Sequence, residues 1–361
     1  MKPPFRADQV GSLLRPQSLL EARRAFHDGR MTAAELRHRE DAAIAEVVAK
    51  QEAIGLEAIT DGELRRDWWH IDFLRGLEGV LIAQSAGPKF RQTEEQPPVA
   101  TVTGRVRLAR PIMVNDFEFL SSCTKRTAKF TIPSPSMLHL RGGRKAISAA
   151  VYPDLGEFWA DLAVAYRGAI AGFAAAGCRY LQLDDVSFAY LCDDKVRASC
   201  RENGDDPARL PRTYADAVNQ ALAERPPGMA ITMHTCRGNF KSSWVAEGGY
   251  ESVAEAMFAI DVDGFFMEFD SDRAGGFEPL RYLPKGKKAV LGLVSTKIGV
   301  IESKDELKRR IDAATKFVPL ENLCLSPQCG FSSTHHGNAL SEAEQWRKLE
   351  LVVEVAREVW G

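Results

Sequence analysis

The sequence lacks three features that mark common classes of protein. Its 47 Lys and Arg residues face 49 Asp and Glu residues, so the net charge is only −2. Without a basic excess the chain has little to neutralise phosphates, and a nucleic-acid partner is not expected. No apolar run reaches the roughly 18 residues of a membrane span, and no apolar signal core follows Met1–Arg6. We therefore expect a cytoplasmic protein with no membrane or nucleic-acid partner.

Cysteine is scarce and odd in number, with seven residues in 361. A disulfide framework is not expected in a long chain without a secretory signal. We therefore expect the cysteines to be reduced thiols. Five cysteines are interpreted as packing or incidental residues: Cys123, Cys178, Cys192, Cys200 and Cys324. The other two, Cys236 and Cys329, directly follow predicted strands.

Short β-type runs alternate with longer helical stretches along the chain. Seven runs are predicted as strands, with a weaker eighth at Phe5–Val10: Leu56–Thr60, Lys129–Pro133, Tyr180–Asp184, Met229–His234, Gly264–Glu268, Ala289–Val294 and Asn322–Ser326. Helices are predicted at Leu155–Ala176, Lys304–Phe317 and Ser341–Val359. About eight strand–helix units favour a (β/α)8 barrel. No Gly-x-Gly-x-x-Gly follows the first strand, which disfavours a dinucleotide-binding sheet.

One stretch, Gly79–Leu120, breaks this alternation. Apolar or small residues recur there with period two, at Val102, Gly104, Val106 and Leu108, as in a β-hairpin. The predicted fold is therefore α/β, a single (β/α)8 TIM-barrel domain over residues 1–361. An insertion at about 79–120 places the hairpin between the second and third strands, where it would cover one mouth of the barrel.

Polar and metal-binding residues follow the predicted strands, which is where parallel barrels carry their active sites. The strand ends read Asp61-Gly62-Glu63, Asp184-Asp185, His234-Thr235-Cys236, Glu268-Phe269-Asp270 and Gln328-Cys329-Gly330. If the barrel is correct, these side chains converge on one face.

Four of these residues suit a metal ion. His234 and Cys236 are alternate residues of one strand, so their side chains point the same way. With Glu268 and Cys329 they offer one imidazole, two thiolates and one carboxylate, a set suited to tetrahedral Zn²⁺. Ligands from three strands favour a catalytic ion over a structural one. A His-x-Cys pair alone is common by chance and buried cysteine usually packs, so the order and position of all four carry the prediction.

Six short motifs, in order, carry a resemblance to a known family. They are Val10-Gly11-Ser12, Thr60-Asp61-Gly62-Glu63, Leu181-Gln182-Leu183-Asp184-Asp185, Met233-His234-Thr235-Cys236, Met267-Glu268 and Ser326-Pro327-Gln328-Cys329-Gly330. Over most of its length the chain resembles the C-terminal catalytic barrel of cobalamin-independent methionine synthases. The resemblance implies that His234, Cys236, Glu268 and Cys329 bind zinc. It also implies that Ser12, Glu63 and Asp184 hold the amino acid part of homocysteine, with Glu63 and Asp184 as the catalytic carboxylates.

The same resemblance implies methyl transfer from 5-methyltetrahydrofolate or another donor to the homocysteine thiol, giving methionine through a zinc-bound thiolate. Trp68 and Trp69 are candidate flat surfaces for the donor, with ordinary packing as the alternative. The chain has room for one barrel only, and the family's Asp-Ile-His-Ser segment is replaced by Leu293-Val294-Ser295-Thr296-Lys297. The donor and its proton source therefore stay open; His335 or His336 could substitute, or form a plain loop.

Two other interpretations compete. The segment 268–275 is similar to short single-barrel proteins related to epoxyalkane:coenzyme M transferase, which favours a lyase that adds a small thiol to an epoxide. The second alternative is a non-catalytic protein that binds zinc or a thiol. Storage alone, however, does not require the predicted ammonium-binding carboxylates.

Overall fold

The computed structural model describes residues 2–83 and 97–361. Its centre is a parallel sheet of seven strands in the order β1-β4-β5-β6-β7-β8-β9. The strands are β1 (Ala58–Ile59), β4 (Thr127–Pro133), β5 (Tyr180–Asp185), β6 (Ala230–Thr235), β7 (Gly264–Glu268), β8 (Lys288–Val294) and β9 (Leu323–Pro327). All seven predicted runs are thus strands, each boundary within two residues of the predicted one.

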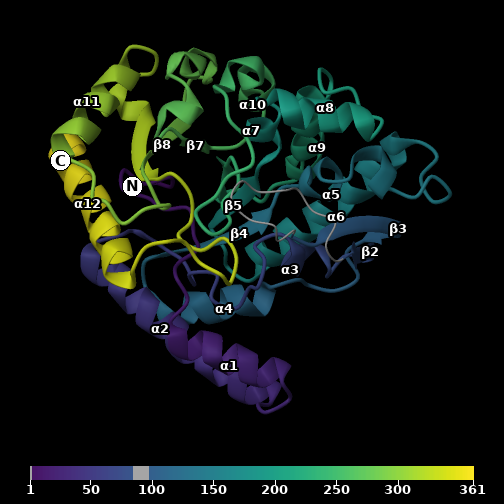
Figure 1. Cartoon of the computed structure of the whole chain (residues 1–361), viewed down its shortest axis with the longest axis horizontal. Helices are drawn as coiled ribbons and strands as arrows, with labels where there is room; N and C mark the ends of the chain where they lie inside the picture. Colours follow the sequence, from purple (N-terminus) through teal and green to yellow (C-terminus); the bar gives the residue numbers. More distant parts are fainter. Residues whose placement is uncertain (1, 84–96) are drawn as a thin grey trace.

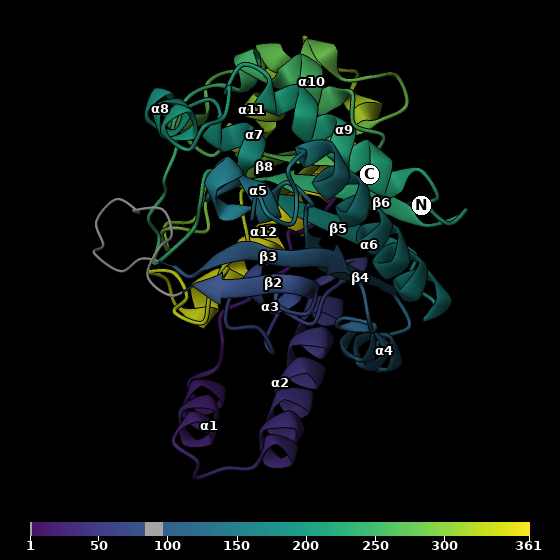
Figure 2. The same cartoon turned by 90° about the vertical axis from the view of Figure 1, so that its right-hand side faces the viewer.

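Helices surround the curled sheet, and α1 and α2 project from the body (Figures 1 and 2). The α-helices are α1 (Gln17–His27), α2 (Ala33–Ile54), α3 (Ile71–Leu74), α4 (Val114–Cys123), α5 (Met137–Leu140), α6 (Leu155–Ala175), α7 (Ser187–Tyr190), α8 (Asp194–Glu202), α9 (Leu210–Leu222), α10 (Ala254–Phe258), α11 (Lys304–Thr315) and α12 (Glu342–Trp360). Short 3-10 turns lie at Gly143–Ala146, Tyr250–Ser252, Asp272–Ala274, Glu278–Tyr282 and Leu320–Asn322. The three predicted helices are confirmed as α6, α11 and α12.

Local sequence explains where the long helices begin. Asp154 accepts a hydrogen bond from the Gly156 amide and starts α6, and Ser341 forms a capping box with Glu344 at the start of α12. The parallel strands are buried on both faces, as parallel sheets require, with every residue of β5, β7 and β9 buried. The sheet therefore presents its chemistry only where its strands end.

The predicted eighth strand at Phe5–Val10 is wrong. Ala7 makes one parallel bridge to Leu325 of β9, and the segment forms no longer ladder. The Asp8 carboxylate explains why: it accepts hydrogen bonds from the amides of Phe5 (3.0 Å) and Gln9 (2.8 Å), which a strand would use for pairing. The fold is thus an α/β fold with a curled parallel sheet of seven strands, consistent with a TIM-like barrel.

A separate antiparallel pair, β2 (Glu78–Ala83) and β3 (Val99–Arg107), lies in the predicted insertion. It follows the first strand of the sheet rather than the second, because Phe5–Val10 is not a strand. Residues 84–96 between β2 and β3 lie outside the described residues, so the predicted hairpin stays a prediction.

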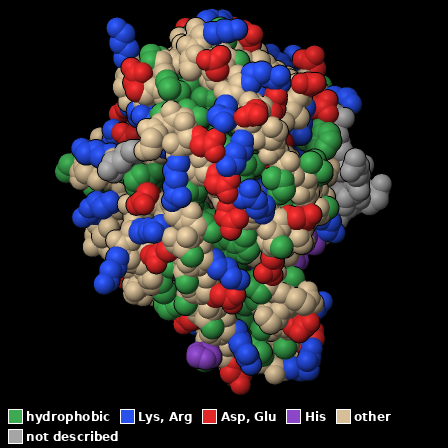
Figure 3. All heavy atoms as spheres, turned by 90° about the vertical axis from the view of Figure 1, so that its left-hand side faces the viewer, with side chains coloured by type: hydrophobic (Ala, Val, Ile, Leu, Met, Phe, Trp, Pro, Cys, Tyr) green, Lys and Arg blue, Asp and Glu red, His purple; other side chains and the backbone are tan. Residues whose placement is uncertain are grey.

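The surface matches the balanced composition. Figure 3 shows acidic and basic side chains intermingled over the face that carries α11 and α12, with no broad area of one sign. Among the described helices, none combines the length and apolar character needed to cross a bilayer.

Candidate active site

A cavity with about 570 Å³ of empty space opens where the parallel strands end. Eight of the nine predicted site residues line it: Ser12, Glu63, Trp68, Trp69, Asp184, His234, Cys236 and Cys329. The ninth, Glu268, lies outside its walls. The fold thus brings side chains from the two ends of the chain and from its middle to one space.

Three buried donors cluster on this cavity. One ligand atom from each of His234, Cys236 and Cys329 lies within 4.8 Å of the others, and the two sulfurs are 3.3 Å apart. His234 is in β6 and Cys236 directly follows it, whereas Cys329 follows β9, 93 residues further along the chain. The hydrogen bond with Cys236 holds the pKa of Cys329 well below the usual thiol range, which favours the thiolate form that ligates metals.

These residues fit a zinc ion. Both ring nitrogens of His234 are buried without a hydrogen-bond partner among the described residues, an arrangement that costs free energy unless another ligand satisfies the ring. One imidazole and two thiolates are donors that Zn²⁺ prefers, and three protein ligands leave a position for a substrate.

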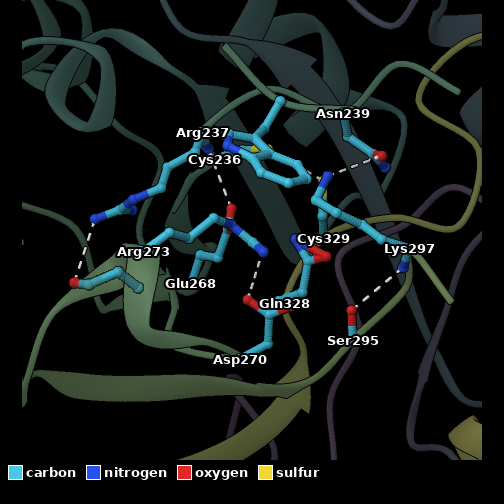
Figure 4. A network of polar contacts seen from close by, with 12 residues as sticks. Cys236, Arg237, Asn239, Glu268, Asp270, Arg273, Ser295, Lys297, Gln328 and Cys329 are labelled. Carbon is cyan, nitrogen blue, oxygen red and sulfur yellow. Dashed lines mark hydrogen bonds and ion pairs between the residues drawn. The ribbon is translucent and has the colours of Figure 1, made fainter. Parts of the chain in front are cut away.

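The fourth predicted ligand is held differently. Glu268 ends β7, is fully buried, and accepts hydrogen bonds from the Arg273 Nε (2.8 Å) and the Arg237 amide (3.1 Å). Burial by itself would raise the pKa of Glu268, but the charges of Lys297, Arg273 and Arg237 together lower it. Figure 4 shows the carboxylate between the two arginines, near Cys236. The structure therefore gathers three predicted ligands and keeps Glu268 in an ion pair beside them.

Two cations of this network were not identified from the sequence as functional. The Lys297 Nζ donates to the Gly238 carbonyl (3.1 Å) and the Asn239 Oδ1 (3.2 Å), and Arg273 pairs with Glu268 and Asp270 (Figure 4). Both follow strand ends, after β8 and β7, which is the signal that could have indicated them.

Glu63 is fixed in a strained backbone conformation. Its φ of 55° lies in the left-handed region, which is uncommon for a residue with a side chain. Asp61 stabilises this turn by accepting the Glu63 amide hydrogen bond at 2.8 Å. The Oε1 of Glu63 accepts from the Thr131 hydroxyl (3.1 Å), while its buried Oε2 has no hydrogen-bond partner in the described part of the chain. This oxygen lies 3.6 Å from the Arg66 Nη1, an ion pair, and belongs to a side chain that lines the cavity.

Asp184 forms the second half of this acidic pair. The Gln182 side chain donates to its Oδ1 at 2.7 Å. Burial, reinforced by the charge of Glu63, raises the pKa of Asp184 to about 7. Burial likewise raises the pKa of Glu63, against the opposing charges of Arg66 and Arg15. The nearby charges of Arg66 and Arg15 do not offset the effect of burial on this pair, and an ammonium group would add positive charge beside it.

Ser12 packs against the loop that carries Cys329. A Cβ atom added to Gly330 would stand 1.9 Å from the Ser12 hydroxyl oxygen, so only glycine allows this approach. The Ser332 amide lies 3.4 Å from the same oxygen. Ser12 thereby lies next to the loop that carries Cys329.

The aromatic predictions have different surroundings. Trp68 stacks on Phe240, with ring centroids 5.8 Å apart and planes at 17°. His335 and His336 meet Trp68 edge-on at 6.1 and 5.9 Å and do not line the cavity themselves. Trp69 lies against His70, with centroids 4.7 Å apart. Both tryptophans line the cavity. The geometry assigns no proton-transfer role to His335 or His336.

The geometry agrees with comparisons to known proteins. A family model described as "Cobalamin-independent synthase, Catalytic domain" matches residues 5–358. The protein YxjH of Bacillus subtilis, described as uncharacterized, is 47% identical over 363 residues, which cover 99% of this chain and 96% of that protein.

Two solved structures resemble the fold. A candidate vitamin-B12 independent methionine synthase from Listeria monocytogenes is 40% identical with a TM-score of 0.81, covering 100% of this chain and 99% of that one. A B12-independent methionine synthase of a Shewanella species, in complex with selenomethionine, is 20% identical with a TM-score of 0.73, covering 98% of this chain and 97% of that one. The chain belongs to the cobalamin-independent methionine synthase family.

Proposed function

We propose that this chain is a zinc-dependent methyltransferase that forms methionine by methylating the thiol of homocysteine. The observation that carries the proposal is one cavity shared by a His/Cys/Cys cluster and a buried pair of carboxylates, Glu63 and Asp184, whose pKa values burial raises. The cluster suits a thiol and the pair suits an ammonium group, and homocysteine carries both. The selenomethionine in the complex of the Shewanella relative supports an amino acid substrate.

His234, Cys236 and Cys329 would hold the zinc ion, with Glu268 as the predicted fourth ligand. When bound, the ion supplies the positive charge that keeps a substrate thiol deprotonated at neutral pH. Glu63 and Asp184 bind the ammonium group of the substrate, and Ser12 lies near its carboxylate. These contacts direct the thiol toward the sulfurs of Cys236 and Cys329.

The transfer step needs few protein groups. The substrate sulfur attacks the methyl carbon, the new carbon–sulfur bond forms, and the donor leaves with the electron pair of its broken bond. Trp68 and Trp69 exclude water from this path and offer flat surfaces to the donor, which is 5-methyltetrahydrofolate or another methylated compound. Orientation in a dry cavity then accounts for much of the rate enhancement.

Cysteine substitution tests the proposal. Cys236→Ser and Cys329→Ser should each reduce bound zinc from one ion per chain to almost none and lower methionine formation more than about 1,000-fold, because a serine hydroxyl is a poor ligand for this ion. Cys123→Ser, away from the cavity, is the matched control and should retain both. Metal analysis and product mass are the readouts. One tightly held zinc in either cavity variant would contradict the assignment.

The epoxide–thiol lyase is the alternative, since the same thiolate could open an epoxide ring. A small thiol without an ammonium group would bring no positive charge to Glu63 and Asp184, so the acidic pair favours the amino acid. Each thiol, homocysteine or coenzyme M, is incubated once with a methyl donor and once with an epoxide. The mass of the product then distinguishes the methyltransferase from the lyase.

A second proposal concerns the closure of the sheet. We infer that the Phe5–Val10 segment occupies the place of the eighth strand and closes the sheet into a barrel. The bridge from Ala7 to Leu325 and the hydrogen bond from Gln182 Nε2 to the Val10 carbonyl (2.7 Å) support this closure. The β2–β3 pair then forms the inserted hairpin of a single domain, which we place in the cytoplasm.

A further inference from the structure

Lys297 is a buried cation that the scheme above does not use. It ends the segment Leu293–Lys297, which stands in place of the family's Asp-Ile-His-Ser segment after β8. Only 4% of the residue is exposed. Burial of an ammonium group costs free energy unless hydrogen bonds and a counter-charge offset it, so its surroundings indicate what the charge serves.

Three oxygen atoms hold this ammonium group in place. The Nζ of Lys297 donates to the Gly238 carbonyl (3.1 Å), the Asn239 Oδ1 (3.2 Å) and the Ser243 carbonyl (3.4 Å). All three acceptors are neutral, and no carboxylate of residues 2–83 and 97–361 lies within 4.0 Å of the group. The position of the charge is therefore fixed, while the charge itself has no ion-pair partner in this part of the chain.

The same contacts connect the two loops that carry the cysteines. Asn239 follows Cys236 in the loop after β6, and its Nδ2 donates to the Gly330 carbonyl (2.8 Å), next to Cys329 in the loop after β9. Both Asn239 and Gly330 line the cavity, and Lys297 lies behind them without lining it. Figure 4 shows its ammonium group turned toward Asn239.

The charge of Lys297 acts on the metal-binding groups. Burial raises the pKa of Glu268, and among the neighbouring charges that lower it, Lys297 has the largest effect. The pKa of Cys329 is lowered first by its hydrogen bond with Cys236, and the charges of His234 and Lys297 lower it further. The predicted metal centre therefore lies in the electric field of this lysine.

The charges around the centre can be counted. Zinc held by one imidazole and two thiolates has no net charge, because the two thiolates offset the ion. Beside it, Glu268 and Asp270 have Arg273 and Arg237 as counter-charges. One positive charge, that of Lys297, is left over. A substrate thiolate would bring one negative charge to the same centre.

We propose that Lys297 supplies the counter-charge of the substrate thiolate and is a positioning residue for the thiol. The inference rests on the proposed function and deepens it. In a buried site with few mobile waters, one fixed charge stabilises an opposite charge more strongly than it would in bulk water. Methyl transfer converts the thiolate into a neutral thioether, so Lys297 favours binding of homocysteine over binding of methionine.

Binding of the substrate and of the product tests this inference without turnover. Homocysteine and methionine are titrated calorimetrically into the zinc-loaded protein and its variants. Lys297→Met should weaken homocysteine binding roughly 10- to 100-fold, which corresponds to about 1.4–2.8 kcal/mol. Methionine binding should change less than about twofold, because its thioether carries no charge.

Three further variants separate the charge from the structure. Lys297→Arg keeps a positive charge and should restore most of the homocysteine affinity. Asn239→Asp keeps Lys297 but gives its ammonium group a carboxylate partner, so it should also weaken homocysteine binding more than methionine binding. Lys316→Met, at the exposed end of α11, is the control and should bind both compounds like the unmodified protein.

The outcomes for Lys297 differ from those for the proposed function. Equal losses of homocysteine and methionine binding in Lys297→Met would indicate a structural role and overturn the inference. Unchanged homocysteine binding in Lys297→Met, or in Asn239→Asp, would overturn it too. The proposed function is contradicted instead if the unmodified protein binds no zinc, or binds zinc but not homocysteine.

Discussion

Two buried acidic groups lie at the same end of the sheet and differ in how their charge is balanced. Glu268 is surrounded by Arg273, Arg237 and Lys297, and these charges lower its pKa. Asp184 and Glu63 lie close to each other, and burial raises the pKa of both. The cations around Glu268 outweigh the effect of its burial, whereas Arg66 and Arg15 do not outweigh the burial of Glu63 and Asp184. The comparison teaches that the Glu63–Asp184 pair is the one that gains more from a cation bound from solution.

The largest effect should come from unbalancing Glu268. Arg273→Met removes its bidentate partner and leaves a buried carboxylate short of charge, which costs about 3–5 kcal/mol. Chemical denaturation at pH 8 measures the free energy of unfolding. Arg281→Met, which breaks the exposed pair with Glu251, is the control and should cost less than about 1 kcal/mol. Equal losses in the two variants would show that Glu268 does not depend on its cations.

The opposite change in the free energy of unfolding is expected for the pair of Glu63 and Asp184. Asp184→Asn removes a charge that burial disfavours, so the free energy of unfolding at pH 8 should rise by about 1–3 kcal/mol. Homocysteine kcat/KM should fall roughly 100-fold, because the ammonium group loses a charged partner. A variant that is both less stable and fully active would reverse the comparison.

The pH dependence follows from the same shift. The pKa of Asp184 is about 7 in the folded chain against 3.8 ordinarily, so the folded protein holds a proton that the unfolded chain has lost. Its contribution to stability is therefore full below pH 3.8 and is lost as pH rises through 7. Homocysteine binding needs the carboxylate and should change the other way, weakening up to about tenfold per unit below pH 7. Titration of Kd against pH, with Asp184→Asn as control, measures this; an unchanged slope in the variant would exclude Asp184.

The smallest effect should come from the hydrogen bond that orients Glu63. Thr131→Val keeps the side-chain shape and removes the 3.1 Å hydrogen bond to its Oε1. We expect homocysteine KM to rise about two- to fivefold, since one such bond contributes about 1 kcal/mol. Ser122→Ala, on the exposed end of α4, is the control. No change in KM would mean that the strained backbone alone fixes Glu63.

Much of the site could be predicted because its residues follow strands. Cys236 and Cys329 stand directly after apolar runs, and the parallel order of those runs places them together. Arg141, which also lines the cavity, could not be recognised in this way. It lies eight residues past β4, in a stretch with other basic residues, and only the folded chain shows that no carboxylate of residues 2–83 and 97–361 bonds to its buried Nε and Nη1. The Arg273 pairing was equally hidden, because a short turn at Asp272–Ala274 returns the side chain to Glu268.

The sequence by itself determined the order of strands and helices, the family, and which residues stand at the strand ends. The elements and the residues at the strand ends follow from local periodicity and spacing, which neighbouring residues set, whereas the family follows from the resemblance of the motifs. Only the tertiary structure decided how far each buried charge is balanced by its neighbours. It also decided the loss of the predicted strand at Phe5–Val10, where the Asp8 side chain takes the backbone amides. The physical reason is that electrostatic balance depends on distances between residues far apart in the chain, and local patterns carry no record of them.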